Sequence, residues 1–285
     1  QPILISRAQL GDVVAKYDGF LLDAFGVLVD SGGALPGAAE LLSYLEARRR
    51  RFYLLTNDAS RLPQAWADRL AGLGVKVPAD RVITSGSLIA RYFAEQGLVG
   101  ARCVVLGTED SRRYVSEAGG LVVDAHAGTA EVVVVCDDDG YEFLSTIEAV
   151  LSMVFARIDA GQRVHLILPN PDLIHPRSVG CYGFTAGSVA LLIESGIRAR
   201  YGPRPGAAYQ FVGLGKPFAP IYAEAERRSG TRNLVMVGDQ LSTDIRGAND
   251  YGIDSVLVAG GVSAGGDPRG PRPTYEWPAL RELFG

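Results

Sequence analysis

Short apolar runs alternate with amphipathic stretches along this chain, and this alternation constrains its fold more than any other feature. Apolar runs typical of strands occupy residues 19–25, 51–57 and 81–86, and each is followed by a stretch with apolar residues at helical spacing. Strands that alternate with helices in this way favour an α/β protein with a mostly parallel sheet.

A second series of strand-like runs begins near residue 98, and the segment 141–161 within it has the periodicity of a long helix. The Gly/Pro-rich stretch 201–208 then indicates a linker, after which the first pattern resumes. We therefore expect one α/β domain that is interrupted by a second α/β module. The predicted domains are 1–97 (first part of the core), 98–208 (inserted module) and 209–285 (second part of the core).

The composition of the 285-residue chain excludes several classes of protein. Hydrophobic residues make up 47% and charged residues 21%, which argues against disorder. A net charge of −4 gives no reason to expect nucleic acid or an anionic membrane as a partner. The three cysteines fit neither a metal spacing nor an even disulfide framework, and we expect small core residues of a reducing compartment. No apolar run approaches membrane-spanning length, so the expectation is a cytoplasmic protein.

Polar residues follow the apolar runs at three separate places. Asp23 ends the first run, Thr56 and Asn57 end the second, and Asp239 ends a later one. In an open parallel sheet, ligands bind outside the carboxyl ends of the strands. Each residue alone is better explained as a turn former. Their coincidence at one edge of the sheet favours a functional site.

The stretch "GDQLSTD" places Asp239 and Asp244 five residues apart across a strand-to-helix turn. With Asp23 they would bring three carboxylates near one point, where repulsion requires a proton or a hard cation. Mg²⁺ with one or two carboxylates and a substrate phosphate is the natural candidate. Taken alone, Lys216 in "GLGKPF" is explained equally well as a surface charge, but beside such a cluster it suits a transferring phosphoryl group.

These segments, in this order, resemble the haloacid dehalogenase (HAD) superfamily. The insert between Thr56 and Lys216 resembles the cap of subfamily IIA, which includes p-nitrophenylphosphatase-like and sugar-phosphate phosphatases. "TSGSLIARY", "LPNPD" and "GDQLSTDIRGANDYGIDSVLV" add to the match. The resemblance implies a Rossmann-like HAD core with a parallel sheet and an inserted α/β cap domain. It also implies a Mg²⁺-dependent phosphohydrolase of a small phosphorylated metabolite, and cap-mediated homodimers occur in relatives.

The resemblance carries over to individual residues. It makes Asp23 the nucleophile that forms an aspartyl-phosphate. The groups that hold the phosphoryl oxygens would be Thr56, Asn57 and Lys216. The Mg²⁺ ligands would be Asp23, the main-chain carbonyl of Phe25, Asp239 and Asp244, the last directly or through water. In the cap, Asn170 and Asp172 of "LPNPD" would face the substrate, although a simple Asn-Pro-Asp turn explains them equally well.

Phe25 departs from the phosphatase pattern, because the family usually carries a second Asp there for proton transfer. Such a group is typically worth ~10²–10⁴ in rate. The substrate could have a good leaving group, or Asp172 or His175 could substitute. Alternatively, the protein binds phosphorylated ligands in a regulatory role with weak or no turnover.

"DAFG" is also similar to the "DAYG" motif of the dehalogenases proper, which makes a dehalogenase-like hydrolase a further alternative. Those enzymes need no metal and insert their cap between the first two motifs. Here only 33 positions separate Asp23 from Thr56, too few for a sizeable cap. Phosphate chemistry is therefore favoured.

Overall fold

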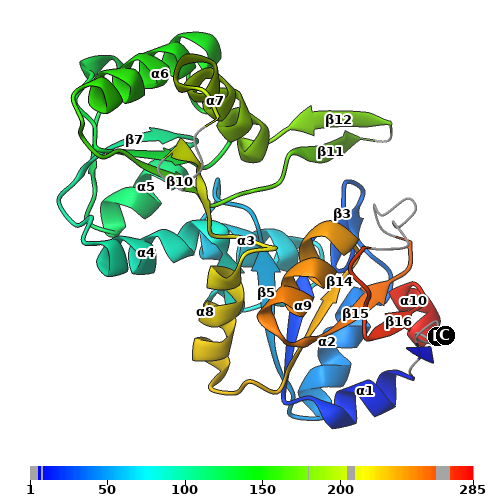
Figure 1. Ribbon diagram of the computed structural model, residues 1–285. Helices are drawn as coiled ribbons and strands as arrows, with labels where there is room; N and C mark the ends of the chain where they lie inside the picture. Colours follow the sequence, from blue (N-terminus) through cyan, green and yellow to red (C-terminus); the bar gives the residue numbers. More distant parts are fainter. Residues whose placement is uncertain (1–5, 8, 179, 204–208, 261–269, 285) are drawn as a thin grey trace. The chain divides into compact units, whose positions relative to one another are not determined.

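The computed structural model describes residues 6–7, 9–178, 180–203, 209–260 and 270–284 (Figure 1). The chain divides into two compact units. Unit 1 comprises residues 1–56, 63–83 and 216–285, and unit 2 comprises residues 57–62 and 84–215. The division at 97/98 and 208/209 remains a prediction of where independently folding domains begin.

The sheet of unit 1 is built around β2, which is buried along its whole length. The strand order is β1 (Ser6–Arg7), β16 (Tyr275–Trp277), β15 (Asp254–Val258), β14 (Leu234–Gly238), β2 (Gly19–Asp23), β5 (Arg51–Thr56) and β6 (Val82–Thr84). The pairings from β1 to β5 are all parallel. A continuous apolar strand such as β2 is typical of a parallel sheet that is covered on both faces.

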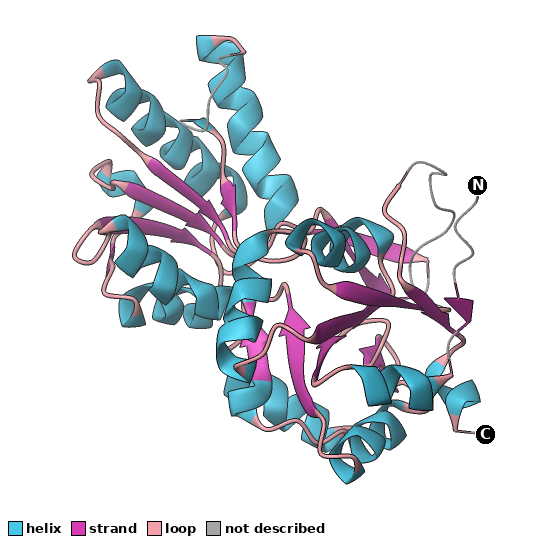
Figure 2. Cartoon of the chain, turned by 60° about the horizontal axis from the view of Figure 1, so that its bottom comes forward, coloured by secondary structure: helices cyan, strands magenta, loops and turns pink. Residues whose placement is uncertain are grey.

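Helices lie on both sides of this sheet (Figure 2). They are α1 (Leu10–Lys16), α2 (Ala38–Ala47), α3 (Pro63–Gly72), α8 (Ala219–Ser229), α9 (Arg246–Tyr251) and α10 (Leu280–Leu283). Phe20 and Leu22 of β2 pack in one cluster with apolar residues of α1, α2, α3 and α10, whereas Leu21 between them is buried outside that cluster. Side chains of a strand alternate between faces, so the neighbouring residues of β2 serve two cores.

A short antiparallel hairpin follows β2 in unit 1. It consists of β3 (Val29–Asp30) and β4 (Gly33–Ala34), and we call it the β3–β4 hairpin. The amide of Gly26 donates to the carbonyl of Val29 at 2.8 Å, and Phe25 forms an isolated bridge with Val29. These contacts fold the segment after Asp23 back on itself.

Unit 2 has its own parallel sheet. The strand order is β13 (Val212–Gly213), β10 (His165–Leu168), β9 (Val132–Val135), β7 (Arg102–Leu106) and β8 (Leu121–Val122). The helices are α4 (Ile89–Gln96), α5 (Glu109–Glu117), α6 (Phe143–Asp159) and α7 (Ala186–Tyr201). Alternate strand residues of this sheet share a core with α6 and α7. The predicted α/β class with parallel sheets is therefore confirmed.

The structure also corrects several expectations. A hairpin of β11 (Ile174–Ser178) and β12 (Cys181–Phe184) was not predicted, because Pro176 argues against a strand. Cys181 on it is exposed, so the expectation of three core cysteines is wrong for this one. The predicted linker 201–208 lies partly outside the described residues, where nothing tests it. No helix in the described part of the chain combines the length and hydropathy that a membrane span requires.

Candidate active site

The carboxyl ends of three neighbouring strands carry the predicted site residues of unit 1. Leu22 of β2 pairs with Val237 of β14, and Asp23 pairs with Leu55 of β5. Asp23 is thus the last residue of β2, and Asp239 directly follows β14. Thr56 is the last residue of β5. The parallel register therefore brings these three chain positions to the same edge of the sheet, as predicted.

Three carboxylates converge at this edge. Asp23, Asp239 and Asp244 each offer a ligand atom, and these atoms lie within 4.8 Å of one another. All three residues are buried, with exposed fractions of 6%, 1% and 0%. The buried ammonium of Lys216 donates to Asp23 Oδ1 at 2.6 Å and to Asp244 Oδ1 at 2.7 Å. One ammonium compensates only one of the three negative charges that full ionisation would place here.

The electrostatics of the cluster follow from this crowding. Burial, and next the charge of Asp244, raise the pKa of Asp23 well above its usual range, although Lys216 opposes the shift. Burial by itself would lower the pKa of Lys216, but the charges of Asp23 and Asp244 raise it overall. Lys216 therefore stays protonated, and the ionised form of Asp23 requires further positive charge.

A divalent ion fits this donor set. The cluster offers buried carboxylate oxygens and excess negative charge, which hard cations such as Mg²⁺ prefer. Asp23, Asp239 and Asp244 would hold the ion.

Local backbone geometry keeps the carboxylates close together. Gly26 has a φ of +84°, and a Cβ at this position would collide with the carboxylate of Asp239. A Cβ at Gly238 would collide with Asp244 in the same way. Only glycine permits both the left-handed backbone at residue 26 and this close approach.

Asp244 lies in a π-helical turn, Leu241–Ile245, that joins β14 to α9. The sequence instead predicted a regular helix from about Thr243. The amide of Gln240 donates to Asp244 Oδ2 at 3.1 Å, and the hydroxyl of Tyr222 donates to the main-chain carbonyl of Asp244 at 3.2 Å. Single π turns occur frequently at functional sites.

Phe25 packs beside the cluster rather than supplying a polar group to it. Its ring meets that of Trp66 edge to face, with centroids 6.0 Å apart, and the Arg69 guanidinium lies 5.6 Å from the Phe25 ring centre. The ring has no atom that could transfer a proton. The departure seen in the sequence is thus an aromatic contact in the structure.

In unit 2 the structure brings Asn57 together with the residues predicted in the cap. Asn57 Nδ2 donates to Asp172 Oδ1 at 2.9 Å, and the amide of Asp172 donates to Asn170 Oδ1 at 3.1 Å. The Ser85 hydroxyl donates to the carbonyl of Asn57 at 2.6 Å. His175 lies on β11 opposite Gly183. The substrate contacts predicted for Asn170 and Asp172 stay predictions.

Sequence reasoning missed three residues around the cluster, namely Trp66, Arg69 and Tyr222. The i, i+3 spacing of Trp66 and Arg69 places them on one face of α3. That spacing could have identified the pair, but nothing in the sequence shows that this face meets Phe25.

Known proteins resemble both the sequence and the fold. A haloacid dehalogenase-like hydrolase model matches residues 20–120, and a HAD-hydrolase-like model matches residues 213–283. The chain is 29% identical to a dihydroxyacetone phosphatase of Corynebacterium glutamicum, over 93% of this chain and 90% of that protein.

Two solved structures share the fold. A possible sugar phosphatase of the HAD superfamily from Cytophaga hutchinsonii superposes with a TM-score of 0.78 and 28% identity, over 97% of this chain and 98% of the other. A glycerol phosphate phosphatase of Mycobacterium tuberculosis in complex with magnesium gives a TM-score of 0.77 and 27% identity, over 98% of this chain and 78% of the other. With its carboxylate cluster at the strand ends of unit 1, the chain belongs to the haloacid dehalogenase-like hydrolases.

Proposed function

We propose that the protein is a Mg²⁺-dependent phosphohydrolase of a small phosphorylated metabolite. The observation that carries this proposal is the convergence of Asp23, Asp239 and Asp244, with Lys216 bonded to two of them. The substrate class is supported by relatives that act on dihydroxyacetone phosphate and glycerol phosphate by name.

The proposed reaction proceeds in two displacements at phosphorus. A carboxylate oxygen of Asp23 attacks, the bond to the ester oxygen breaks, and the alcohol leaves with a proton from solvent. Water then attacks the aspartyl-phosphate, which releases inorganic phosphate and restores the carboxylate. Magnesium, when bound, would neutralise charge on the phosphoryl oxygens.

The residues of the chain have separate tasks in this scheme. Lys216 orients Asp23 through the 2.6 Å hydrogen bond and would place its positive charge beside the phosphoryl group. The amide of Ala24 donates to Asp23 Oδ1 at 2.7 Å, which fixes the carboxylate further. We assign Thr56 and Asn57, which end and follow β5, to the phosphoryl oxygens, and the Phe25 carbonyl to the metal.

Phe25 motivates the second candidate, a ligand-binding protein with weak or no turnover. Since its ring provides no acid, the leaving alcohol must take its proton from elsewhere. A hydrolase with this residue should therefore favour esters with good leaving groups.

Phosphate release from a panel of phosphate esters separates the two candidates. With Mg²⁺ we expect turnover of three-carbon phosphates and of p-nitrophenyl phosphate, with a loss of at least 10³-fold in Asp23→Asn. EDTA should abolish the activity, and Mg²⁺ should restore it. Binding of esters without release of phosphate would favour the second candidate instead.

A further inference from the structure

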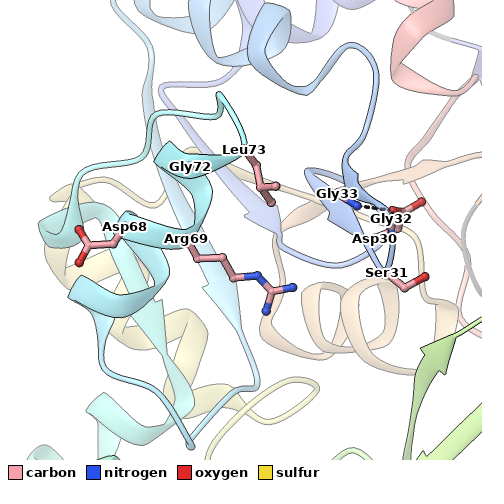
Figure 3. A pocket seen from close by; sticks show the side chains of 8 residues that line it. All are labelled: Asp30, Ser31, Gly32, Gly33, Asp68, Arg69, Gly72 and Leu73. Atoms are coloured by element: carbon pink, nitrogen blue, oxygen red, sulfur yellow. Dashed lines mark hydrogen bonds between the residues drawn. The ribbon is translucent and has the colours of Figure 1, made fainter.

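A pocket of unit 1 lies between the β3–β4 hairpin and α3, with a volume of about 440 Å³ (Figure 3). The described residues that line it include none of the three clustered carboxylates. In Figure 3 the carboxylate of Asp30 turns back to the amide of Gly33, from which it accepts a hydrogen bond of 3.1 Å. Because Asp30 and Asp68 outweigh Arg69 in charge, the pocket disfavours an anionic substrate. The contacts that bear on phosphate binding lie in unit 2 instead.

Asn57 lies close to the nucleophile along the chain. Leu55 of β5 is the register partner of Asp23 in the neighbouring strand, and Asn57 follows Leu55 by two residues. The strand spacing and two extended residues together amount to at most about 12 Å between the main chains of Asp23 and Asn57. One phosphoryl group on the carboxylate of Asp23 can span the remaining gap between the two side chains.

The side-chain amide of Asn57 is held at both of its ends. The residue is only 5% exposed, and its Nδ2 donates to Asp172 Oδ1 at 2.9 Å. A Cβ at Gly215 would collide with Asn57 Oδ1, so the oxygen end lies directly against the backbone of Gly215. The hydroxyl of Ser85 donates to the main-chain carbonyl of Asn57 at 2.6 Å, which also fixes the backbone.

Asp172 is itself anchored, because the loop that carries it lies on the first turn of α7. Its main-chain carbonyl accepts from the amide of Gly187 at 3.0 Å and from the hydroxyl of Thr185. The amide of Asp172 donates to Asn170 Oδ1 at 3.1 Å. A Cβ at Gly187 would collide with the carbonyl of Pro171, so the loop and the helix are in close contact. A carboxylate on such a fixed backbone can hold its partner in one orientation.

A carboxylate selects the nitrogen end of an amide. An ionised carboxyl group only accepts hydrogen bonds, whereas an Asn side chain has a donor end and an acceptor end. If Asp172 were removed, the amide of Asn57 could turn over and present Oδ1, which repels the oxygens of a phosphoryl group. An amide nitrogen carries two protons, so one nitrogen can serve both a carboxylate and a phosphoryl oxygen.

We propose that Asp172 is a positioning residue that orients the amide of Asn57, so that its nitrogen donates to a phosphoryl oxygen of the substrate. Asp172 then acts on the phosphoryl group through Asn57, in place of the direct substrate contact that the sequence predicts for it. Its effect should therefore be the same for every phosphate ester, whichever alcohol leaves. This inference rests on the proposed function, which assigns Asn57 to the phosphoryl oxygens.

Two esters with different alcohols test this task in the intact chain with Mg²⁺. Asp172→Ala should raise KM for p-nitrophenyl phosphate and for glycerol 3-phosphate by the same factor, roughly 5–50-fold, as expected when a hydrogen bond to a charged group is weakened. The change in kcat should be less than threefold. Asp172→Asn keeps an acceptor for Nδ2 of Asn57 and should stay within threefold of the parent. Unequal losses for the two esters would indicate a contact with the leaving group and overturn the proposal.

A double variant shows whether Asp172 acts through Asn57. Asn57→Ala should raise KM by roughly 10–100-fold, and Asp172→Ala should add less than about twofold in that background, because the two residues form one coupled pair. Losses that multiply in the double variant would mean an independent role and refute the proposal. Asp124→Ala is the matched control, since Asp124 also holds a turn of unit 2, through the amide of His126 at 2.7 Å. It should leave both esters unaffected.

Binding of inorganic phosphate separates this inference from the proposed function. Calorimetry with Mg²⁺ measures the affinity for phosphate without turnover. Binding that is at least fivefold weaker in Asp172→Ala supports the inference, even if the parent hydrolyses no ester and the proposed function fails. Tighter binding in this variant would mean that the carboxylate of Asp172 competes with phosphate for Asn57. That result, unchanged binding, or a parent that binds no phosphate would each overturn the inference.

Discussion

Phe25 makes aromatic contacts at a position where an acid was expected. The ring cannot transfer a proton, yet it contacts Trp66 and Arg69 in an arrangement that an aspartate could not form. An aspartate introduced at residue 25 would therefore not act as a simple acid, because it would lie beside the guanidinium of Arg69.

We expect Phe25→Asp alone to raise kcat less than tenfold, although a well-placed acid-base group is worth about 10²–10⁴. Arg69 would pair with the new carboxylate and lower its pKa, so that it stays ionised when an acid is needed. Phe25→Asp/Arg69→Met should gain at least tenfold more than the single variant. Glycerol 3-phosphate is the substrate to use, since its leaving group carries no charge.

Arg69→Met alone is the control for that experiment and should leave the turnover of glycerol 3-phosphate nearly unchanged. A gain of two orders of magnitude in Phe25→Asp alone would contradict the interpretation of residue 25.

Among the elements of the fold, the π-helical turn Leu241–Ile245 determines where Asp244 lies. The Tyr222 hydroxyl supports this turn from α8, through the carbonyls of Asp244 at 3.2 Å and Thr243 at 3.4 Å. Loss of such a hydrogen bond costs about 0.5–1.5 kcal/mol, enough to loosen the turn.

Tyr222→Phe should therefore raise the Mg²⁺ concentration for half-maximal activity by about 5- to 50-fold and change kcat at saturating Mg²⁺ less than threefold. The measurement is a Mg²⁺ titration of phosphate release. In the control, Tyr251→Phe removes a neighbouring hydroxyl that donates to Glu226 at 2.6 Å instead. Equal shifts in both variants would mean that general loosening, rather than support of the turn, explains the effect.

A second prediction at this scale concerns α8 itself. Hydrogen bonds from Arg227, opposed by partial burial and supported by Arg228, lower the pKa of Glu224 to about 2. The contacts that lower this pKa stabilise the folded state. Their full contribution is present at pH values above about 4.5, the ordinary pKa of the carboxyl, and it is lost as the pH falls toward 2. After discounting for solvent screening, Glu224→Gln should lower the free energy of unfolding by about 1 kcal/mol at pH 7.

Chemical denaturation at pH 7 and pH 3 checks this prediction, and the difference between parent and variant should shrink at pH 3. Glu46→Gln is the comparison, because Glu46 forms a looser pair with Arg81 at 3.9 Å and is 59% exposed. If the difference in unfolding free energy between parent and variant grows toward low pH, the prediction is wrong.

The sequence could predict the carboxylate cluster because strand direction alone decides where strand ends meet. Asp23 and Asp239 needed only the order of the strands, whereas Lys216 follows a strand of the other sheet, and its place was predicted from its chemistry beside carboxylates and from the family resemblance. The contact of Arg69 with Phe25 could not be predicted, because it depends on which face of α3 meets the segment after β2, and packing settles that. The hairpin of β11 and β12 also escaped, since residues such as Tyr182 and Phe184 are exposed there and show no buried pattern.

At the scale of the whole molecule, the charged cluster belongs to one unit. Asp23, Lys216, Asp239 and Asp244 all lie in unit 1, and each unit has its own sheet and core. A bound ion should thus slow hydrogen exchange in unit 1 more than in unit 2.

Hydrogen exchange with and without Mg²⁺ tests this expectation. At 100 times the dissociation constant, a ligand stabilises the state that binds it by about 2.7 kcal/mol. We expect slower exchange in β2, β14 and the turn Leu241–Ile245, with little change in β7 and β9 of unit 2. Asp244→Asn should remove the effect. Uniform protection across both units would argue against a metal site confined to unit 1.

The long insertion, residues 84–215, ends one residue before Lys216. Exchanging it for the corresponding segment of a relative would leave the carboxylates in place, yet the downstream seam of such a chimera would touch the ammonium that joins Asp23 to Asp244. At that seam, the success of such a graft would accordingly depend on the backbone path between residues 215 and 216.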